Sequence, residues 1–301
     1  MARTRKKSSR KASRAASSTD WGKVWRIASP IVAGLCVIAM GTGMTFGVKH
    51  LDQTARELLV QDAITIELTP PVSTEGLRWV PQSEIDALIE RSLGLLRGRD
   101  PLSAAALADV GRMLERCGWF DGSPKVQRVG RDRVQIRGKW RVPAAVVNHN
   151  GRDHLISWDG MIMPMVFAPG AAEVKAILGA GLAPADPNPE TKYMKAWPGT
   201  DVQAALALLR VLVNEPYFHQ VGAIDVRLMA RQGVLEIITP TESRVVWGAP
   251  PGQFKPGEVT TEVKLQRLSS LFRKDGRIDG NSARMEIHGP LPLREGLDIN
   301  P

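Results

Sequence analysis

The stretch "RVPAAVVNHNGRDHLISWDGMIMP", residues 141–164, decides how the C-terminal half of the chain is expected to fold. It contains two dipeptides that favour tight turns, Asn150-Gly151 and Asp159-Gly160. Asn-Gly is the strongest hairpin signal, because both central positions of a type I′ turn need a positive φ. The runs on either side of the turns have the length and composition of strands. The sequence therefore predicts a meander of three antiparallel strands over 141–166.

Two histidines, His149 and His154, flank the first of these turns. Together with Asp153 they offer side chains that bind metal ions, but no third or fourth ligand lies nearby at a recognised spacing. We therefore interpret the histidines as residues of a hairpin and predict neither a metal site nor a cofactor. A metal or catalytic site at this turn is the alternative.

The positive charge of the chain is concentrated at its start. Residues 1–26 carry nine basic side chains and one acidic one, a net charge of +8, and the whole chain has a net charge of +9. The rest of the chain is nearly neutral, so we expect no specific nucleic-acid surface there. We predict that 1–26 is a disordered basic cytoplasmic tail that sets membrane topology. Binding of this tail to anionic lipid or to DNA is the alternative.

An uncharged apolar segment follows the basic tail. As a helix, residues 27–48 would reach about 33 Å, enough to cross a hydrocarbon layer of about 30 Å. The segment is longer than the apolar region of a cleaved signal peptide. We predict an uncleaved, single-pass transmembrane helix in the cytoplasmic (inner) membrane, with the N-terminus inside and the C-terminal domains outside. Ala39, Gly43 and Gly47 form a predicted helix-packing face on it.

The exported part has the composition of a globular protein. Apolar residues make up 43% of the chain and charged residues 24%, and 301 residues suggest two compact domains. Cys36 falls in the predicted span, so Cys117 has no partner for an intramolecular disulfide outside the membrane. The exported domains must therefore depend on their hydrophobic cores.

Hydrophobic periodicity and turn signals predict the order of the remaining elements. The first group comprises a strand at 63–68, helices at 81–96 and 103–117, and strands at 125–129 and 133–147. After the meander come a helix that begins at 200 and ends before 216, strands at 223–230, 234–239 and 244–248, a helix at 258–273, and a strand at 283–288. The predicted fold class is α+β: one N-terminal transmembrane helix, a β-α-α-β-β domain at 57–140, and a mostly antiparallel β domain with two or more helices at 141–289. Residues 290–301 are expected to be a flexible tail.

Several strings in this order resemble the bacterial cell-division family FtsQ/DivIB. They are "LERCGWFDGSPKVQRVGRDRVQIRGKWRVPAAVV" (114–147), "HLISWDGMIMP" (154–164), and "VVWGAPPGQ" (245–253) with "EVKLQRLSSLF" (262–272). The last pair contains a Trp247-Gly248 turn and a Lys264-Leu265-x-x-Leu268 helix pattern. An "IDVR" string lies at 224–227, whereas the family places a similar string near its last strand. Each string is short, and their common order carries the resemblance.

The resemblance implies a function as well as a fold. It implies that 57–140 is a POTRA-like domain and 141–289 an FtsQ-like β domain. It also implies a non-enzymatic scaffold of the divisome that acts in the cell cycle at the septum. The implied partners are single-span division proteins similar to FtsB and FtsL, and possible further ones are FtsK-like proteins or components of the septal synthase. No oligomeric state follows from it.

The last predicted strand is the expected partner-binding site. Ala283, Met285 and Ile287 are predicted on one face, and Arg284, Glu286 and His288 on the other. An exposed sheet edge presents unpaired N–H and C=O groups to an incoming strand, and the charged face could select the partner. The alternative is a terminal strand that only completes the sheet.

Two other classes of function remain as alternatives. One is a POTRA-bearing component of an envelope secretion or transport assembly. The other is an envelope hydrolase, which needs a nucleophile with a base or a pair of convergent acids. The strings G-x-S-x-G and H-E-x-x-H are absent from the sequence, and S-x-x-K occurs only at residues 8–11, within the basic tail. We therefore predict that the chain is not an enzyme.

Overall fold

The structure, a computed structural model, describes residues 64–72, 78–99, 103–130, 132–184, 188, 191–253 and 255–295. These residues belong to one compact unit, Asp62–Pro301. The predicted cytoplasmic tail, the predicted span at 27–48 and its packing residues Ala39, Gly43 and Gly47 lie outside the described residues, as do residues 296–301 of the predicted flexible tail.

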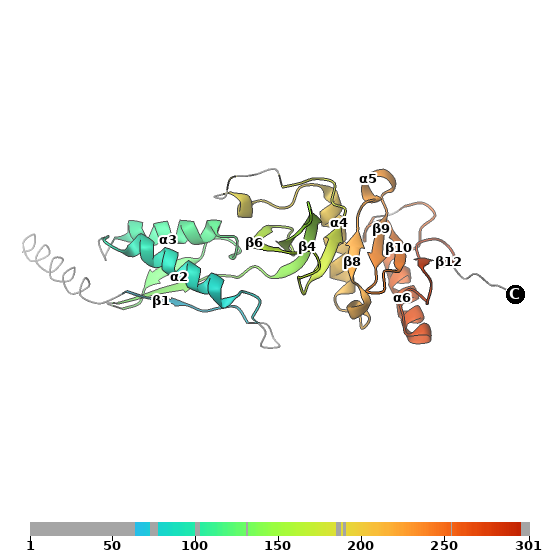
Figure 1. Cartoon of the computed structure of the whole chain (residues 1–301), viewed down its shortest axis with the longest axis horizontal. Helices are drawn as coiled ribbons and strands as arrows, with labels where there is room; N and C mark the ends of the chain where they lie inside the picture. Colours follow the sequence, from blue (N-terminus) through green and yellow to red (C-terminus); the bar gives the residue numbers. More distant parts are fainter. Residues whose placement is uncertain are drawn as a thin grey trace, which may run out of the picture. The chain divides into compact units, whose positions relative to one another are not determined.

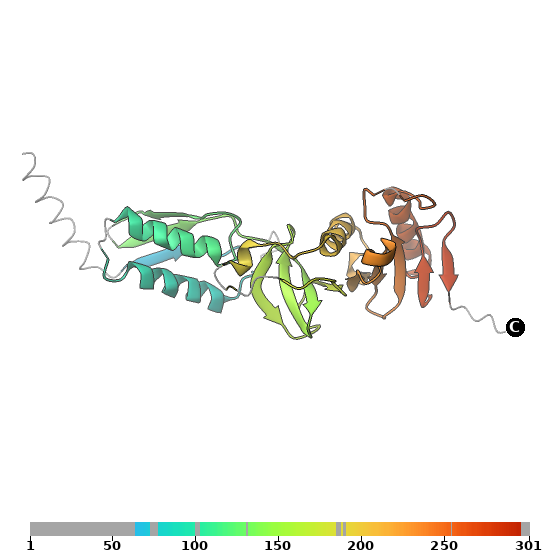
Figure 2. The ribbon, with the colours of Figure 1, turned by 90° about the horizontal axis from the view of Figure 1, so that it is seen from above.

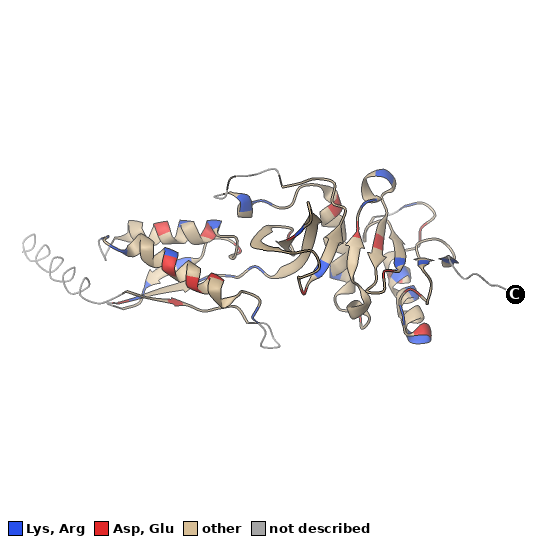
Figure 3. Cartoon of the chain, viewed as in Figure 1, with Lys and Arg blue, Asp and Glu red and all other residues tan. Residues whose placement is uncertain are grey.

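The first described elements follow the expected β-α-α-β-β order. They are β1 (Thr65–Leu68), α2 (Gln82–Leu96), α3 (Ala104–Arg116), β2 (Lys125–Arg128) and β3 (Arg133–Arg137). The strands form a sheet of order β1-β3-β2, in which β1 and β3 are parallel and β2 and β3 antiparallel. Both helices carry acidic and basic residues along their length (Figure 3).

The two helices bury one apolar stripe each. Leu88 of α2 and Val110 and Leu114 of α3 belong to the same core cluster as Val134 and Ile136 of β3. Leu88, Val110 and Leu114 are at most 1% exposed, so the apolar periodicity of the sequence correctly identified the inner faces.

The second sheet contains the remaining strands (Figure 1, Figure 2). Its strand order is β12-β11-β10-β9-β8-β7-β4-β5-β6. The strands are β4 (Pro143–His149), β5 (Arg152–Ser157), β6 (Ile162–Phe167), β7 (Lys175–Leu178), β8 (Ala223–Asp225), β9 (Leu235–Ile238), β10 (Arg244–Gly248), β11 (Arg284–Glu286) and β12 (Leu293–Glu295). Its longer helices are α4 (Thr200–Leu212) and α6 (Thr261–Asp275).

The predicted meander is confirmed in β4, β5 and β6, which pair antiparallel in sequence order. Asn150 has a φ of 50° and Gly151 a φ of 69°, the two positive values that the hairpin turn requires. The single strand predicted over 133–147 is wrong, because residues 138–142 separate β3 from β4. Within this connection Trp140 packs on Phe120, with ring centroids 4.3 Å apart.

The large sheet is mixed: five of its eight strand pairs are antiparallel, as a mostly antiparallel domain requires, but its three parallel pairs were not predicted. The pairs β4–β7, β7–β8 and β10–β11 are parallel. The chain passes from β7 to β8 through α4, and from β10 to β11 through α6. A helix between neighbouring strands is the usual way to make a parallel pair. Both crossovers step along the sheet in the same direction, so right-handed connections place both helices on the same face. In agreement, Leu206 of α4 and Leu268 of α6 lie in one core cluster with Ile237 and Val245.

The predicted fold class also included a transmembrane helix. Among the described residues, no helix combines the length and the apolar character that crossing a membrane requires. The fold class is corrected accordingly: the described residues form an α+β structure with a large mixed sheet and contain no membrane-spanning helix.

The strand predicted over 223–230 is only half correct. The strand ends at Asp225, and a short helix, α5 (Met229–Gln232), takes the place of its second half. The cause is local: the Asp225 carboxylate accepts a hydrogen bond of 3.0 Å from the backbone N–H of Arg227, which turns the chain.

Candidate partner-binding surface

The strand predicted to be the last one is not at the edge of the sheet. β11 pairs with β10 on one side and with β12 on the other, and β12 is the outermost strand at this end. Periodicity did not reveal β12 because it has three residues and follows Gly289-Pro290, which we read as the end of the last strand. The structure also corrects the prediction of a flexible tail for residues 293–295, which form β12.

The two faces of β11 differ as predicted, except at one position. Met285 and Ile287 are buried in the core, whereas Arg284 and Glu286 are half-buried on the opposite face. Ala283 is exposed, contrary to the prediction. It precedes the strand, where its carbonyl accepts a hydrogen bond of 2.9 Å from the backbone N–H of Arg244.

The polar face of this sheet end is an internal network of ion pairs. The buried Glu236 carboxylate accepts hydrogen bonds from Arg284 (2.7 Å) and Arg244 (2.9 Å). The buried Asp225 carboxylate pairs with Arg227 and, at 3.4 Å, with Arg244. Burial acts to raise the pKa of Asp225, but its contacts with the two arginines outweigh burial and lower the pKa. Arg284 is therefore engaged within the fold.

His288 packs against the end of β10. Its carbonyl oxygen accepts a hydrogen bond of 2.8 Å from the backbone N–H of Val259. A Cβ atom at Gly248, whose φ is +88°, would lie 2.7 Å from the Cβ of His288. The backbone of Gly248 thus leaves the room that His288 needs.

The connection from β11 to β12 is held by α6. Arg267 donates hydrogen bonds to the carbonyl oxygens of Ile287 (2.7 Å), Gly289 (2.5 Å) and Pro290 (2.7 Å). Arg294 of β12 pairs with Asp275 at the end of α6, at 2.8 Å. These contacts were not predictable from sequence patterns, because they join residues about 20 positions apart without any motif.

Two leucines lie exposed at this sheet end. Leu291 is 75% and Leu293 58% exposed, the two highest values among the large apolar side chains of the described residues. No described strand pairs with the outer side of β12. This geometry leaves backbone N–H and C=O groups beside an apolar surface, and an extended segment could occupy both.

His149 and His154 serve as packing residues in the hairpin. Their ring centroids lie 6.0 and 5.6 Å from that of Trp197, which is 2% exposed. Burial, reinforced by the positive charge of Lys192, lowers the pKa of His154. The described residues contain no group of three or more His, Cys, Asp or Glu side chains that could hold a metal ion.

Comparison with models of known protein families finds no match for this chain, and comparison with curated proteins finds no relative.

Proposed function

We propose that the chain is a non-enzymatic scaffold of bacterial cell division, which recruits other division proteins outside the cytoplasmic membrane at the division site. The outer edge of β12, which no described strand covers, is the observation that carries this proposal. The ordered strings that resemble FtsQ/DivIB give independent support from the sequence.

Recruitment would proceed by strand addition. The outward backbone groups of β12 offer hydrogen bonds to an extended partner segment, and alternate side chains of that segment supply specificity. Leu291 and Leu293 would be covered by the incoming segment, so burial of apolar surface would add to the backbone hydrogen bonds. The contacts of Arg267 and Arg294 hold the edge to α6, which reduces the entropy lost on binding.

The chemistry of the edge suggests the partner. Arg284 is tied to Glu236, so the partner is selected less by the charges of β11 than by the two exposed leucines. A partner strand with apolar residues at alternate positions fits this surface. Extracytoplasmic segments of single-span division proteins similar to FtsB or FtsL are the partners that we propose.

Site-specific photocrosslinking in dividing cells tests the proposal. A photoreactive residue at Leu293 should capture a single-span division protein, whereas one at Val142, which is also exposed but lies in the β3–β4 connection, should not. A fluorescent fusion of the full chain should gather at septa. Equal capture from both positions, or a fusion spread evenly over the cell surface, would contradict the proposal.

A further inference from the structure

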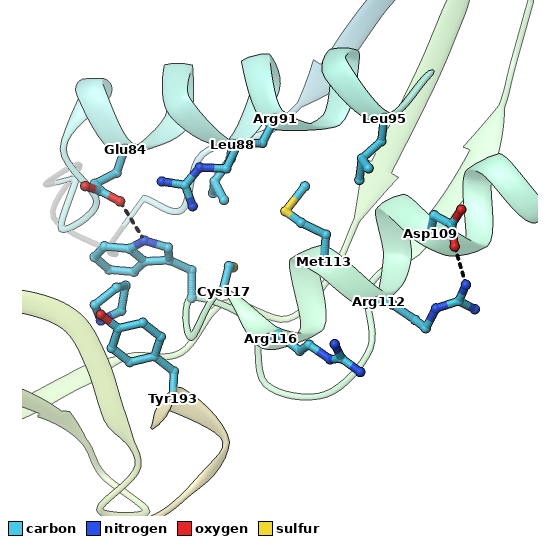
Figure 4. A pocket seen from close by; sticks show the side chains of 12 residues that line it. Glu84, Leu88, Arg91, Leu95, Asp109, Arg112, Met113, Arg116, Cys117 and Tyr193 are labelled. Carbon is cyan, nitrogen blue, oxygen red and sulfur yellow. Dashed lines mark hydrogen bonds and ion pairs between the residues drawn. The ribbon is translucent and has the colours of Figure 1, made fainter. Parts of the chain in front are cut away.

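A second candidate surface lies far from β12 in the sequence, in a groove between α2 and α3 (Figure 4). Its volume is about 540 Å³, within the range of about 300–1,000 Å³ that is common for ligand pockets. The apolar residues that line it come from both helices and include Leu88, Leu95 and Met113. Met side chains are flexible and polarizable, and they suit surfaces that adapt to apolar partners.

One end of the groove is closed by aromatic residues. Trp119 is 1% exposed, and its indole N–H donates a hydrogen bond of 3.2 Å to Glu84. Tyr193 lies against Gly118, where a Cβ atom would come within 2.7 Å of the Cβ of Tyr193. Gly118 has a φ of +85°, so both the backbone and the spacing favour glycine there. The groove therefore has a fixed aromatic end.

The rim of the groove is positively charged. Arg91 of α2 and Arg112 and Arg116 of α3 line it, with Glu84 and Asp109 as the two acidic residues. Asp109 is paired with Arg112 and with Arg99, which lies outside the lining, and Glu84 accepts the bond from Trp119. The Arg91 guanidinium is exposed and makes no hydrogen bond or ion pair with the described residues. Asp109 is thus neutralised by arginines, Glu84 keeps its charge while it holds Trp119, and Arg91 presents its charge to solvent beside an apolar floor.

The walls of the groove determine which backbone can bind in it. Its two long walls are α2 and α3, whose backbone groups are bonded within the helices, so they offer no edge to an incoming strand. A helix satisfies its own backbone hydrogen bonds and needs only an apolar ridge that fits the groove.

From the apolar floor, the helical walls and the arginine rim, we propose that the α2–α3 groove binds an amphipathic helix of a partner protein, whose apolar ridge is flanked by Asp or Glu. The ridge would pack on Leu95 and Met113, above the buried Leu88, and a carboxylate would pair with Arg91. This site is separate from the β12 edge and does not depend on the proposed role in division.

The test uses the full chain and a phage-displayed library of helices of about 20 residues, with a fixed leucine ridge and randomised flanks. We expect the enriched peptides to carry Asp or Glu beside the ridge. In fluorescence anisotropy, Arg91→Glu should weaken their binding by about tenfold and remove most of its salt dependence. Arg137→Glu makes the same change of charge on β3, outside the groove, and should leave binding within about twofold.

Two further variants address the floor and the helical form. Met113→Gln should weaken binding by about fivefold or more while the melting temperature of the protein stays close to that of the wild type. A proline in the middle of an enriched peptide should abolish its binding. The proposal is overturned if no peptide is enriched, if the enriched flanks are neutral or basic, or if Arg91→Glu and Arg137→Glu have equal effects. Binding of vesicles of anionic phospholipid in place of acidic helices would also overturn it.

Discussion

Arg267 of α6 donates a hydrogen bond of 2.7 Å to the backbone carbonyl oxygen of Ile287, at the end of β11. The same guanidinium also reaches the carbonyl oxygens of Gly289 and Pro290. A side chain of the helix thus fixes the path of the chain from β11 into the outermost strand. The proposed docking edge consequently depends on a residue that does not itself lie in the sheet.

Replacing this arginine should loosen the edge. Arg267→Ala leaves three carbonyl groups without their charged donor, and we expect the free energy of unfolding to fall by about 1–3 kcal/mol. Amide hydrogen exchange should accelerate most at residues 291–295. Arg273→Ala, at an exposed position of the same helix, is the matched control and should change neither quantity. Unchanged exchange in Arg267→Ala would show that the hydrogen bonds from Arg267 do not hold β12 in place.

A buried ion pair should support the loop that joins β10 to α6. Lys264 donates a hydrogen bond of 2.8 Å to Glu258, and both side chains are less than 10% exposed. Lys264→Met leaves the buried carboxylate with only the more exposed Lys255, 3.6 Å away, so we expect a loss of about 3 kcal/mol in chemical denaturation. The double variant Lys264→Met/Glu258→Gln should recover part of that loss. If the double variant is as unstable as the single one, the Lys264–Glu258 ion pair does not account for the loss.

The same carboxylate should make stability depend on acid. Burial acts to raise the pKa of Glu258, but hydrogen bonds from Lys264 and from the backbone of Ala249 lower it below the ordinary value of 4.5. A lowered folded-state pKa contributes stability that is complete above pH 4.5 and is lost as pH falls through the folded-state pKa. In denaturation curves below pH 4.5, Glu258→Gln should show a shallower loss of stability than the wild type. Parallel curves would contradict this assignment.

Two glycines with similar backbone should respond differently to alanine. Gly151 has a φ of +69° with nothing within 4 Å of an added Cβ, whereas at Gly248 that atom would lie 2.5 Å from Glu258 and 2.7 Å from His288. Gly151→Ala should cost about 1 kcal/mol from conformation alone. Gly248→Ala should cost more, at least about 2 kcal/mol, because steric overlap is added to the conformational cost. Equal melting temperatures for the two variants would refute this difference.

His154 should act through its packing. Burial comes first among the causes that lower its pKa, followed by Lys192, His149 and Arg152, and only Asp153 opposes them. The unfolded chain therefore takes up a proton before the folded one, and stability should decline as pH falls below about 6.5. His154→Phe should flatten this decline and keep the contact with Trp197. Zinc should leave the melting temperature of the wild type unchanged, and a large rise would restore the metal-site interpretation.

Local features were predictable from the sequence, because short-range rules determine them. The turn at Asn150-Gly151 needs two positive φ values, which these residues adopt readily. The inner faces of α2 and α3 follow from helical periodicity, and β10 was placed at its observed bounds. In each case a residue type and its spacing were sufficient.

The end of the sheet was not predictable in the same way. β11 was expected at the edge because Gly289-Pro290 reads as a stop, yet the chain returns three residues later as β12. The hydrogen bond from Arg267 joins α6 to the end of β11, and no sequence pattern connects these two elements. The parallel pairs of the sheet likewise depend on long crossovers, and β7 has no strong signal of its own.

Proline substitution in β12 tests the docking edge most directly. Consecutive residues of a strand point their N–H groups to opposite sides, so Leu293→Pro and Arg294→Pro remove different donors. The partner crosslink would be recorded from a photoreactive residue at Leu291. The account predicts that the variant that loses an outward-pointing N–H keeps the melting temperature but no longer yields this crosslink. The other variant should instead weaken the pairing of β12 with β11. Full crosslinking in both variants, with the fold intact, would contradict strand addition at β12.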